Sequence, residues 1–240
     1  MTVRPNIVLV HGAFADSSSW NAIIPSLFGQ GYPVIAAAIP MRGLQSDADF
    51  VASLMKTING PIVLVGHSYG GSVISNAATQ VSNVVALVFV SGTAPDLGES
   101  TGDLTNRFPG STLGDKLTMV PLPDGDTDLY LQQDKFWAQF CADIPESDAK
   151  LMAVGQRPFT TSAVNGVSGD PAWKTIPSRF IYGSLDKNIP PAAHAFMAKR
   201  AGSVETVEVN GSSHVVMLSH PDAVSQLIQN AVAASVPVAA

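Results

Sequence analysis

Cysteine and charged residues are scarce in this sequence. Only Cys141 carries a thiol among 240 residues, so an internal disulfide and a multi-cysteine metal site are both excluded. We expect this thiol to be buried and inert. Charged side chains make up 13% of the chain and hydrophobic ones 46%, whereas charged residues average about 25% in globular proteins. That balance predicts a large apolar core, such as a parallel sheet covered on both faces.

Basic residues and long apolar runs are also lacking. The formal net charge at pH 7 is -6 and lysine and arginine form no cluster, so nucleic acid is not expected as a partner. No apolar run approaches the roughly 18 to 20 residues of a membrane span, and the tail 231–240 is broken by Pro237. Residues 1–6 lack the pattern of a secretion signal. We predict a cytoplasmic protein with no membrane partner.

What the chain does contain is an alternation of short apolar runs and helical periodicity. The runs typical of strands are 7–10, 33–38, 62–65, 84–90, 179–182 and 204–209. The segments with helical spacing between and after them are 20–30, 46–58, 72–80, 190–201 and 221–235. This alternation predicts an α/β fold with a doubly wound, mostly parallel sheet of about six strands. Right-handed crossovers would bring the loops after the strands to one edge, where ligands bind.

The alternation stops between residues 94 and 176. This stretch is rich in Pro, Gly, Asp and Thr, with helical pieces at 129–140 and 147–154. Because a structureless loop of that length is improbable inside a domain, we predict a helical cap inserted over the sheet edge. The domain organisation is then a core of residues 1–93 and 177–240 and a cap of residues 94–176.

The strongest chemical signal is a Gly-x-Ser-x-Gly motif at residues 66–70, between an apolar run and a helical segment. That order predicts a nucleophile elbow, in which Ser68 lies on a sharp strand-to-helix turn. Gly66 and Gly70 would let the helix pass close to the strand. A glycine-rich turn with no chemistry can carry the same motif, so its meaning depends on the partners of the serine.

A serine hydroxyl needs an adjacent base, and the base needs a carboxylate to orient it. In this kind of site the chain order is Ser, acid, His. Of five histidines, His214 follows the last strand in a Gly/Ser loop and is the predicted base. His194 lies within a helix and is expected at the surface, and His220 begins the last helix. His11 and His67 precede the serine in the chain.

The acid is expected to be Asp186, which follows a strand at the same edge of the sheet. Asp96, after the strand at 84–90, is the alternative. The oxyanion donors expected for such a site are the backbone amide after the nucleophile, here of Tyr69, and one after the first strand. For the second donor we expect the amide of Ala13, with that of Phe14 as a further candidate.

Aromatic side chains in the cap suggest a substrate pocket, although they would equally suit a small core of the cap itself. The predicted pocket residues are Phe14, Tyr130, Phe136, Trp137, Phe140 and Met217. No histidine–carboxylate cluster has the spacing of metal ligands, so no metal is expected.

Four ordered pieces of the chain resemble the α/β-hydrolase superfamily over nearly its whole length. They are residues 8–13, residues 66–71, Asp186 with Ile189-Pro190, and Ser213-His214 with Met217-Leu218. Within the superfamily the chain is most similar to small bacterial esterases related to the plant methyl esterase and hydroxynitrile lyase group, through His11-Gly12-Ala13 leading to Trp20 and through the C-terminal His-x-x-Met-Leu. The resemblance implies a six-stranded core, a helical cap and no cofactor.

Two departures from the lyases of that group favour ester hydrolysis. Gly12 stands where those lyases have threonine, and Val215 where they have lysine. Ser68 argues against the epoxide hydrolases and haloalkane dehalogenases, whose nucleophile is aspartate. We therefore predict a serine carboxylesterase that hydrolyses small esters through an acyl-enzyme. A cofactor-free lyase, a perhydrolase and a non-enzymatic ligand receptor stay as alternatives.

Overall fold

A six-stranded parallel sheet forms the centre of the fold. The structure is a computed structural model that describes residues 4–235; residues 1–3 and 236–240, with Pro237 of the predicted tail, lie outside the described part. The strand order is β2-β1-β3-β4-β8-β9. The strands are β1 (Asn6–Val10), β2 (Val34–Ala37), β3 (Ile62–His67), β4 (Val84–Val90), β8 (Ser178–Gly183) and β9 (Glu205–Val209). The predicted parallel sheet is thereby confirmed.

Burial along the strands follows their place in the sheet. Every residue of β3 and β8 is buried, as expected for central strands whose two faces are both covered. β9 is an edge strand, and Glu205 to Val209 alternate between half-buried and exposed.

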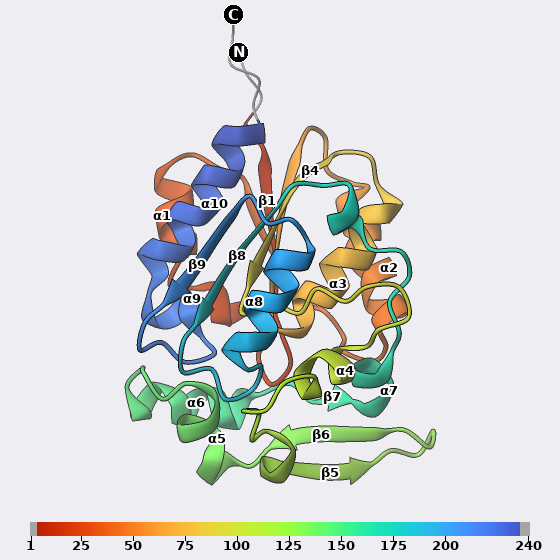
Figure 1. Ribbon diagram of the computed structural model, residues 1–240, viewed down its shortest axis with the longest axis vertical. Coiled ribbons are helices and arrows are strands. Elements are labelled where there is room, and N and C mark those ends of the chain that lie inside the picture. Colours follow the sequence, from red (N-terminus) through yellow and green to blue (C-terminus); the bar gives the residue numbers. More distant parts are fainter. Residues whose placement is uncertain (1–3, 236–240) are drawn as a thin grey trace, which may run out of the picture.

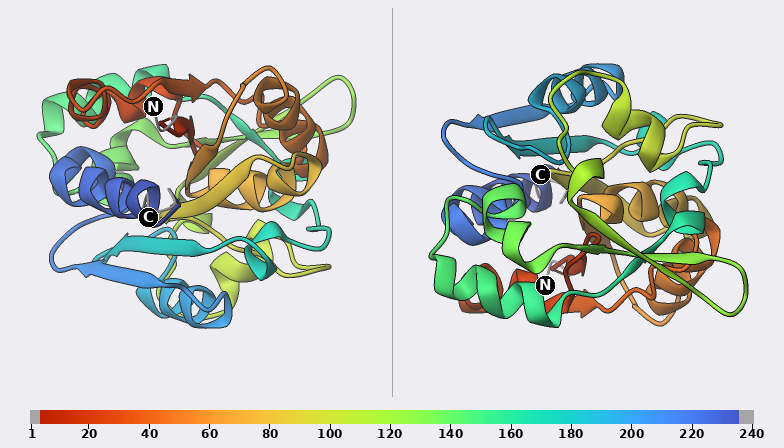
Figure 2. Two further views of the ribbon diagram at one scale, coloured as in Figure 1. Left: turned by 90° about the horizontal axis from the view of Figure 1, so that it is seen from above. Right: turned by 90° about the horizontal axis from the view of Figure 1, so that it is seen from below.

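Helices cover both faces of the sheet (Figures 1 and 2). α1 (Ile24–Gly29) and α10 (Pro221–Ser235) lie on one face, and α2 (Leu44–Met55), α3 (Tyr69–Ala77) and α8 (Pro191–Arg200) lie on the other. Short turns of helix complete the core: η1 (Ser17–Trp20), η2 (Ala78–Gln80) and α9 (Val216–Ser219). The first helix begins later than its periodicity predicts, because Pro25 fits only the first turn of a helix.

Most of the segment between β4 and β8 lies across the end of the sheet where the parallel strands finish, at the bottom of Figure 1, and its last part runs back beside α3 to the start of β8. Its helices are α4 (Thr101–Asn106), η3 (Gly114–Lys116), α5 (Gln133–Phe140), α6 (Glu146–Gly155), α7 (Thr161–Asn165) and η4 (Ala172–Lys174). It also contains an antiparallel sheet of β5 (Leu117–Pro121), β6 (Thr127–Leu131) and β7 (Phe159–Thr160). The exact limits of core and cap, at residues 94 and 176, stay a prediction.

The predicted helical insertion contains helices α5 and α6 but also strands that the sequence did not suggest. Residues 129–131, predicted as helix, belong to β6, and α5 starts only at Gln133. β5 and β6 form a hairpin whose turn contains Gly125 with φ of 92°, a conformation that glycine adopts without strain. Tertiary pairing with β5 and β7 therefore decides the conformation of these residues.

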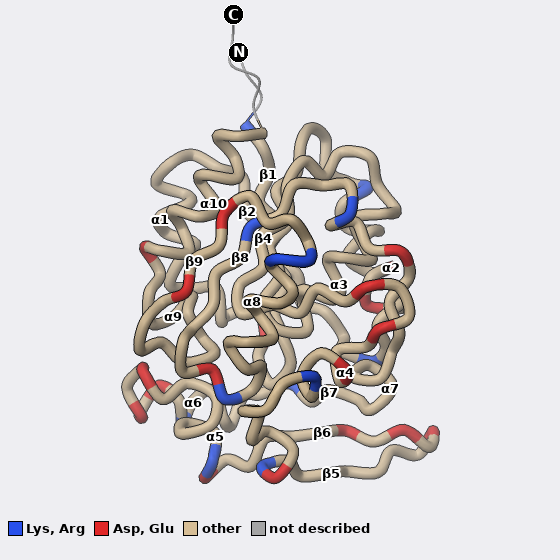
Figure 3. The backbone as a smooth tube through the Cα atoms, viewed as in Figure 1, with Lys and Arg blue, Asp and Glu red and all other residues tan. Residues whose placement is uncertain are grey.

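Charged residues are spread thinly over the core, and acidic ones gather at the outer edge of the insertion (Figure 3). Asp124, Asp126 and Asp128 lie in or beside the β5–β6 turn. Within residues 4–235, none of the helices combines the length and the apolar character that crossing a bilayer requires.

Candidate active site

Ser68 lies at the junction of β3 and α3 in a backbone conformation that residues other than glycine rarely adopt. Its φ is 52° and its ψ is -124°. The turn is tight because both flanking glycines touch backbone: a Cβ on Gly66 would lie 2.5 Å from the Gly70 carbonyl oxygen. This is the strained shape expected of a nucleophile elbow.

Backbone hydrogen bonds to the end of β4, to the loop after it and to the first turn of α3 hold the elbow in place. The Ser68 amide donates to the Val90 carbonyl at 3.2 Å, and its own carbonyl accepts from the amides of Gly71 at 2.9 Å and Thr93 at 3.0 Å. The Thr93 hydroxyl lies 2.6 Å from that of Ser72, which in turn lies 2.8 Å from the Thr101 hydroxyl on α4. The cap is thus joined to the elbow by a buried chain of hydroxyl groups.

His214 and Asp186 come from the loops after β9 and β8 and meet beneath the cap. The Nδ1 atom of His214 lies 2.6 Å from Asp186 Oδ2. The other carboxylate oxygen, Oδ1, accepts the amides of Asn188 at 2.8 Å and Ile189 at 3.0 Å. Burial opposes ionisation of Asp186, but the neighbouring His214 and the hydrogen bonds to this carboxylate hold its pKa well below the usual range.

A second histidine, His194, also reaches Asp186, and its predicted place at the surface was wrong. The ring is fully buried, and its Nε2 lies 3.1 Å from Asp186 Oδ2. It stacks on the Tyr182 ring at 4.9 Å between centroids. The pattern could have shown this, because His194 shares the helical stripe of the buried residues Ala193, Met197 and Ala198 on α8.

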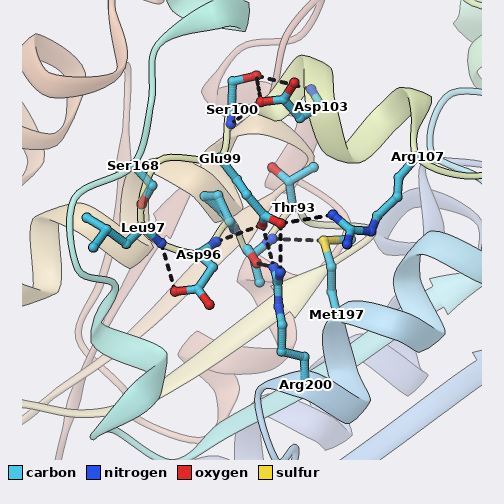
Figure 4. A network of polar contacts seen from close by, with 12 residues as sticks. Thr93, Asp96, Leu97, Glu99, Ser100, Asp103, Arg107, Ser168, Met197 and Arg200 are labelled. Carbon is cyan, nitrogen blue, oxygen red and sulfur yellow. Dashed lines mark hydrogen bonds and ion pairs between the residues drawn. The ribbon is translucent and has the colours of Figure 1, made fainter.

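Asp96, the alternative acid, is engaged elsewhere. Its carboxylate pairs with the Lys174 ammonium at 2.6 Å and is about one-third exposed. Figure 4 shows it in the loop after β4, beside Glu99, whose carboxylate binds both Arg107 and Arg200. Asp186, rather than Asp96, is the carboxylate that contacts His214.

The loop after β1 packs directly against the elbow. A Cβ on Gly12 would lie 2.5 Å from the Cβ of Ser68 and 2.9 Å from the His67 carbonyl oxygen, so only glycine fits. The next residues, Ala13 and Phe14, line the same cavity as Ser68 and Tyr69. The expected oxyanion donors are therefore close to the serine.

The two histidines before the serine have structural contacts. His11 Nε2 accepts the Ile39 amide at 3.1 Å, so its Nδ1 carries the proton and donates to the Gly12 carbonyl at 3.0 Å. Burial lowers the pKa of His11 to about 4, which keeps it neutral. His67 is fully buried, its Nε2 lies 3.2 Å from the His214 carbonyl, and burial lowers its pKa well below the usual value.

A cavity of about 240 Å³ joins the serine and the histidine to the cap. Of the predicted pocket residues, Phe14 and Phe140 line it. The aliphatic lining was not foreseen, because our prediction favoured aromatic residues. These unforeseen apolar residues, together with Phe159, are Leu113, Leu117, Leu129, Val164 and Ile189.

The other four predicted pocket residues lie elsewhere. Phe136 is buried behind Phe140, with ring centroids 5.0 Å apart. Trp137 is 39% exposed on the outer side of α5, and its Nε1 donates to Ile144. Tyr130 alternates with the inward Leu129 on β6, and Met217 is buried in α9. Strand alternation and helix rotation, which the composition of the cap does not reveal, decide these positions.

A second, larger hollow of about 550 Å³ lies between η1 and α6. Phe14 lines both spaces, and its ring meets those of Phe140 and Phe159 edge-on at 6.4 and 6.3 Å. Phe14 is therefore the wall that separates them. In the part of the chain that the structure describes, no group of three or more His, Cys, Asp or Glu side chains is placed to hold a metal ion.

Comparison with known proteins finds relatives that match nearly the whole chain. The chain is 25% identical over 257 residues to alpha/beta hydrolase nvfD of Aspergillus novofumigatus, covering 98% of this chain and 100% of that protein. It is 25% identical to an alpha-hydroxynitrile lyase of Arabidopsis thaliana, over 92% of this chain and 94% of the lyase. Methylesterase 2 of the same plant is 21% identical over 92% and 94% of the two chains.

Solved structures agree on the fold. A crystal structure of polyneuridine aldehyde esterase superposes with a TM-score of 0.82 at 19% identity, covering 95% of this chain and 99% of that one. These relatives confirm the predicted kinship with plant methyl esterases and hydroxynitrile lyases, while a bacterial origin stays a prediction. The model of the Alpha/beta hydrolase family matches residues 7–227, and the chain belongs to that family.

Proposed function

We propose that this protein is a serine carboxylesterase that hydrolyses small, uncharged esters through an acyl-enzyme. The observation that carries the proposal is that Ser68 and His214 line the same cavity. Ser68 lies on a strained turn, and His214 is hydrogen-bonded to the buried carboxylate of Asp186. Methylesterase 2 and polyneuridine aldehyde esterase, named for ester chemistry, are among the similar proteins and support the reaction class.

In this mechanism the proton moves through His214. Because Nδ1 is bonded to Asp186, Nε2 is the nitrogen that takes the proton as the Ser68 oxygen attacks the ester carbonyl. The amides of Ala13 and Tyr69 stabilise the oxyanion, a contribution of about 10²–10³ in kcat for each donor. His214 then gives the proton to the leaving alcohol. It next activates a water that hydrolyses the acyl-enzyme.

The cavity determines the substrate class. Its volume of about 240 Å³ lies below the ~300–1,000 Å³ of common ligand sites. Its described lining is mostly apolar and contains no Asp, Glu, Lys or Arg. We therefore assign short, uncharged acyl and alcohol groups to it.

The test compares wild type with Ser68→Ala on p-nitrophenyl acetate and butyrate. We expect the variant to lose roughly 10⁴-fold or more in kcat. Ser111→Ala is the matched control, because Ser111 lines the same cavity and has no role in the mechanism. A fluorophosphonate probe should label Ser68, as read by peptide mass spectrometry.

Two outcomes would count against the esterase. Ester turnover that survives Ser68→Ala, or a probe attached to another residue, would remove the proposed nucleophile. Release of cyanide from mandelonitrile with no ester turnover would instead assign lyase chemistry. This substrate is included because a hydroxynitrile lyase is among the similar proteins.

A further inference from the structure

The carboxylate of Asp186 contacts two buried histidines. Besides His214 at 2.6 Å, its Oδ2 lies 3.1 Å from Nε2 of His194 on α8. We propose that His194 is a positioning residue, which locks the carboxylate of Asp186 and limits how strongly that carboxylate attracts the proton of His214. The inference rests on the proposed roles of Asp186 and His214 in ester hydrolysis.

The hydrogen-bond pattern around Asp186 is complete only with His194. An ionised carboxylate has about four lone-pair positions, two on each oxygen. The amides of Asn188 and Ile189 occupy those of Oδ1, and the two histidines occupy those of Oδ2. With all four positions taken, the carboxylate cannot rotate away from His214.

His194 is held as a neutral donor. Its side chain is about 1% exposed, and burial lowers its pKa, an effect that outweighs the attraction of Asp186. A neutral ring carries one proton, and contact with a carboxylate puts that proton on Nε2. Stacking on Tyr182, with the ring planes 16° apart, fixes the direction in which the N–H points.

Among the described residues, few other charged or titratable groups lie near His194 and Asp186. Tyr182 on β8 faces His194, and its hydroxyl lies 3.4 Å from Glu208 on β9. His67, at the end of β3, faces His214. Lys187 follows Asp186 but donates its ammonium to the Ala138 carbonyl. On the rest of α8, the charged residues Lys199 and Arg200 lie in the last turn. Arg200 packs over the ring of Phe196, together with Arg107 from the end of α4.

A second N–H donor on Oδ2 disperses part of the negative charge that would otherwise act on His214. A carboxylate with one donor fewer is a stronger base and stabilises the imidazolium form of His214 more. Loss of the His194 donor should therefore strengthen the attraction of Asp186 for the proton on His214 and loosen the orientation of the His214 ring. The first effect moves the acidic limb of the pH profile, and the second lowers kcat.

The test uses His194→Leu, His194→Gln and the wild type. For His194→Leu we expect kcat on p-nitrophenyl acetate to fall roughly tenfold with KM nearly unchanged. The acidic limb of kcat/KM should move about half a pH unit upward. His194→Gln keeps an N–H donor and should stay near wild type. Met197→Leu is the control, since it alters the same buried helix face away from Asp186.

The Nδ1 proton of His214, in the hydrogen bond to Asp186, gives a nuclear magnetic resonance signal whose readout needs no turnover. Its resonance should move downfield in His194→Leu relative to wild type and stay unchanged in Met197→Leu. Equal chemical shifts and equal kcat in His194→Leu and wild type overturn the inference. If His194→Leu does not fold, His194→Asn replaces it, because its shorter donor should not reach Asp186 and should lose the activity that His194→Gln keeps.

The two proposals fail differently. A wild-type protein without Ser68-dependent ester turnover contradicts the esterase alone, because the Nδ1 proton resonance of His214 still tests the contact with His194. A normal esterase whose kcat and His214 resonance are the same in His194→Leu contradicts only the positioning role.

Discussion

Two of the four non-glycine residues with positive φ in the described chain belong to the site. Ser68 and Phe14, with φ of 52° and 59°, both line the catalytic cavity. For residues with side chains, such conformations cost about 1–3 kcal/mol each, and they persist only where the surroundings determine them. At Ser68 the close contact of Gly12 and the backbone bonds to Val90 and Thr93 provide that determination.

Gly12→Ala tests how closely the first loop must approach the serine. The new methyl group would lie 2.5 Å from the Ser68 Cβ, so the loop with Ala13 has to move away. We expect kcat on p-nitrophenyl acetate to fall about 100-fold through misplaced oxyanion donors, and the free energy of unfolding to fall by about 1–3 kcal/mol.

Gly29→Ala is the control for this change. Gly29 lies at the end of α1, and a Cβ there meets nothing within 4 Å. The variant should keep full activity and unfold at the same or a slightly higher urea concentration. Equal kcat values for Gly12→Ala and Gly29→Ala would show that the close approach is not needed for catalysis.

At the level of single residues, the sequence predicts Ser68, Asp186 and His214 in their chain order, but it does not predict the buried residue that contacts Asp186 from α8. The motif around Ser68 and the loop positions of Asp186 and His214 follow from strands ending at one edge of a parallel sheet. The place of His194 does not, because it depends on how α8 is rotated against β8 and its following loop. A polar residue on an apolar stripe was the available signal.

At the level of elements, the core and two helices of the insertion were predictable, and the strands of the insertion were not. Buried apolar runs mark β1, β3, β4 and β8 because both faces of a central parallel strand are covered. The cap strands are short, and β5 is mostly exposed while β6 is mostly buried, so neither shows a clear alternation. The Asp124-Gly125 pair between β5 and β6 was the one local sign of a hairpin.

The loop that carries Phe14 should set the length of substrate the site accepts. Phe14→Gly removes the wall between the cavities of about 240 and 550 Å³ and suits the φ of 59°. We expect kcat/KM for p-nitrophenyl octanoate relative to acetate to rise roughly tenfold, since burial of about two more methylenes at about 0.8 kcal/mol each corresponds to that factor.

Phe89→Ala is the matched truncation for Phe14→Gly. Phe89 is buried on β4, stacks on Phe180 at 4.4 Å and lines neither cavity. It should lose stability with no change in chain-length preference. The role of Phe14 is contradicted if both variants keep the wild-type ratio of octanoate to acetate.

At the scale of the whole molecule, Glu99 joins the core to the cap (Figure 4). Its carboxylate binds Arg200 on α8 at 2.8 Å and Arg107, at the end of α4, at 3.0 Å. Arg200 also donates to the Ala94 carbonyl at 2.8 Å, so the chain entering the cap is fixed against α8. Glu99 is 20% exposed, so water screens these pairs only in part.

The charge of Glu99 should make this junction sensitive to acid. Burial opposes its ionisation, yet Arg200 and Arg107 hold its pKa below the usual value of 4.5. A carboxylate with a lowered folded-state pKa stabilises the fold fully above its unfolded pKa and loses that stabilisation as the pH falls through the folded pKa. At pH 7 we expect Glu99→Gln to lower the free energy of urea unfolding by about 2 kcal/mol. The difference from wild type should shrink steadily below about pH 4.5.

Glu146→Gln, which breaks an exposed pair with Lys150, should change stability by less than about 0.5 kcal/mol at either pH. A Glu99→Gln difference that stays constant or grows in acid would mean that packing, and not the carboxylate charge, joins the cap to the core.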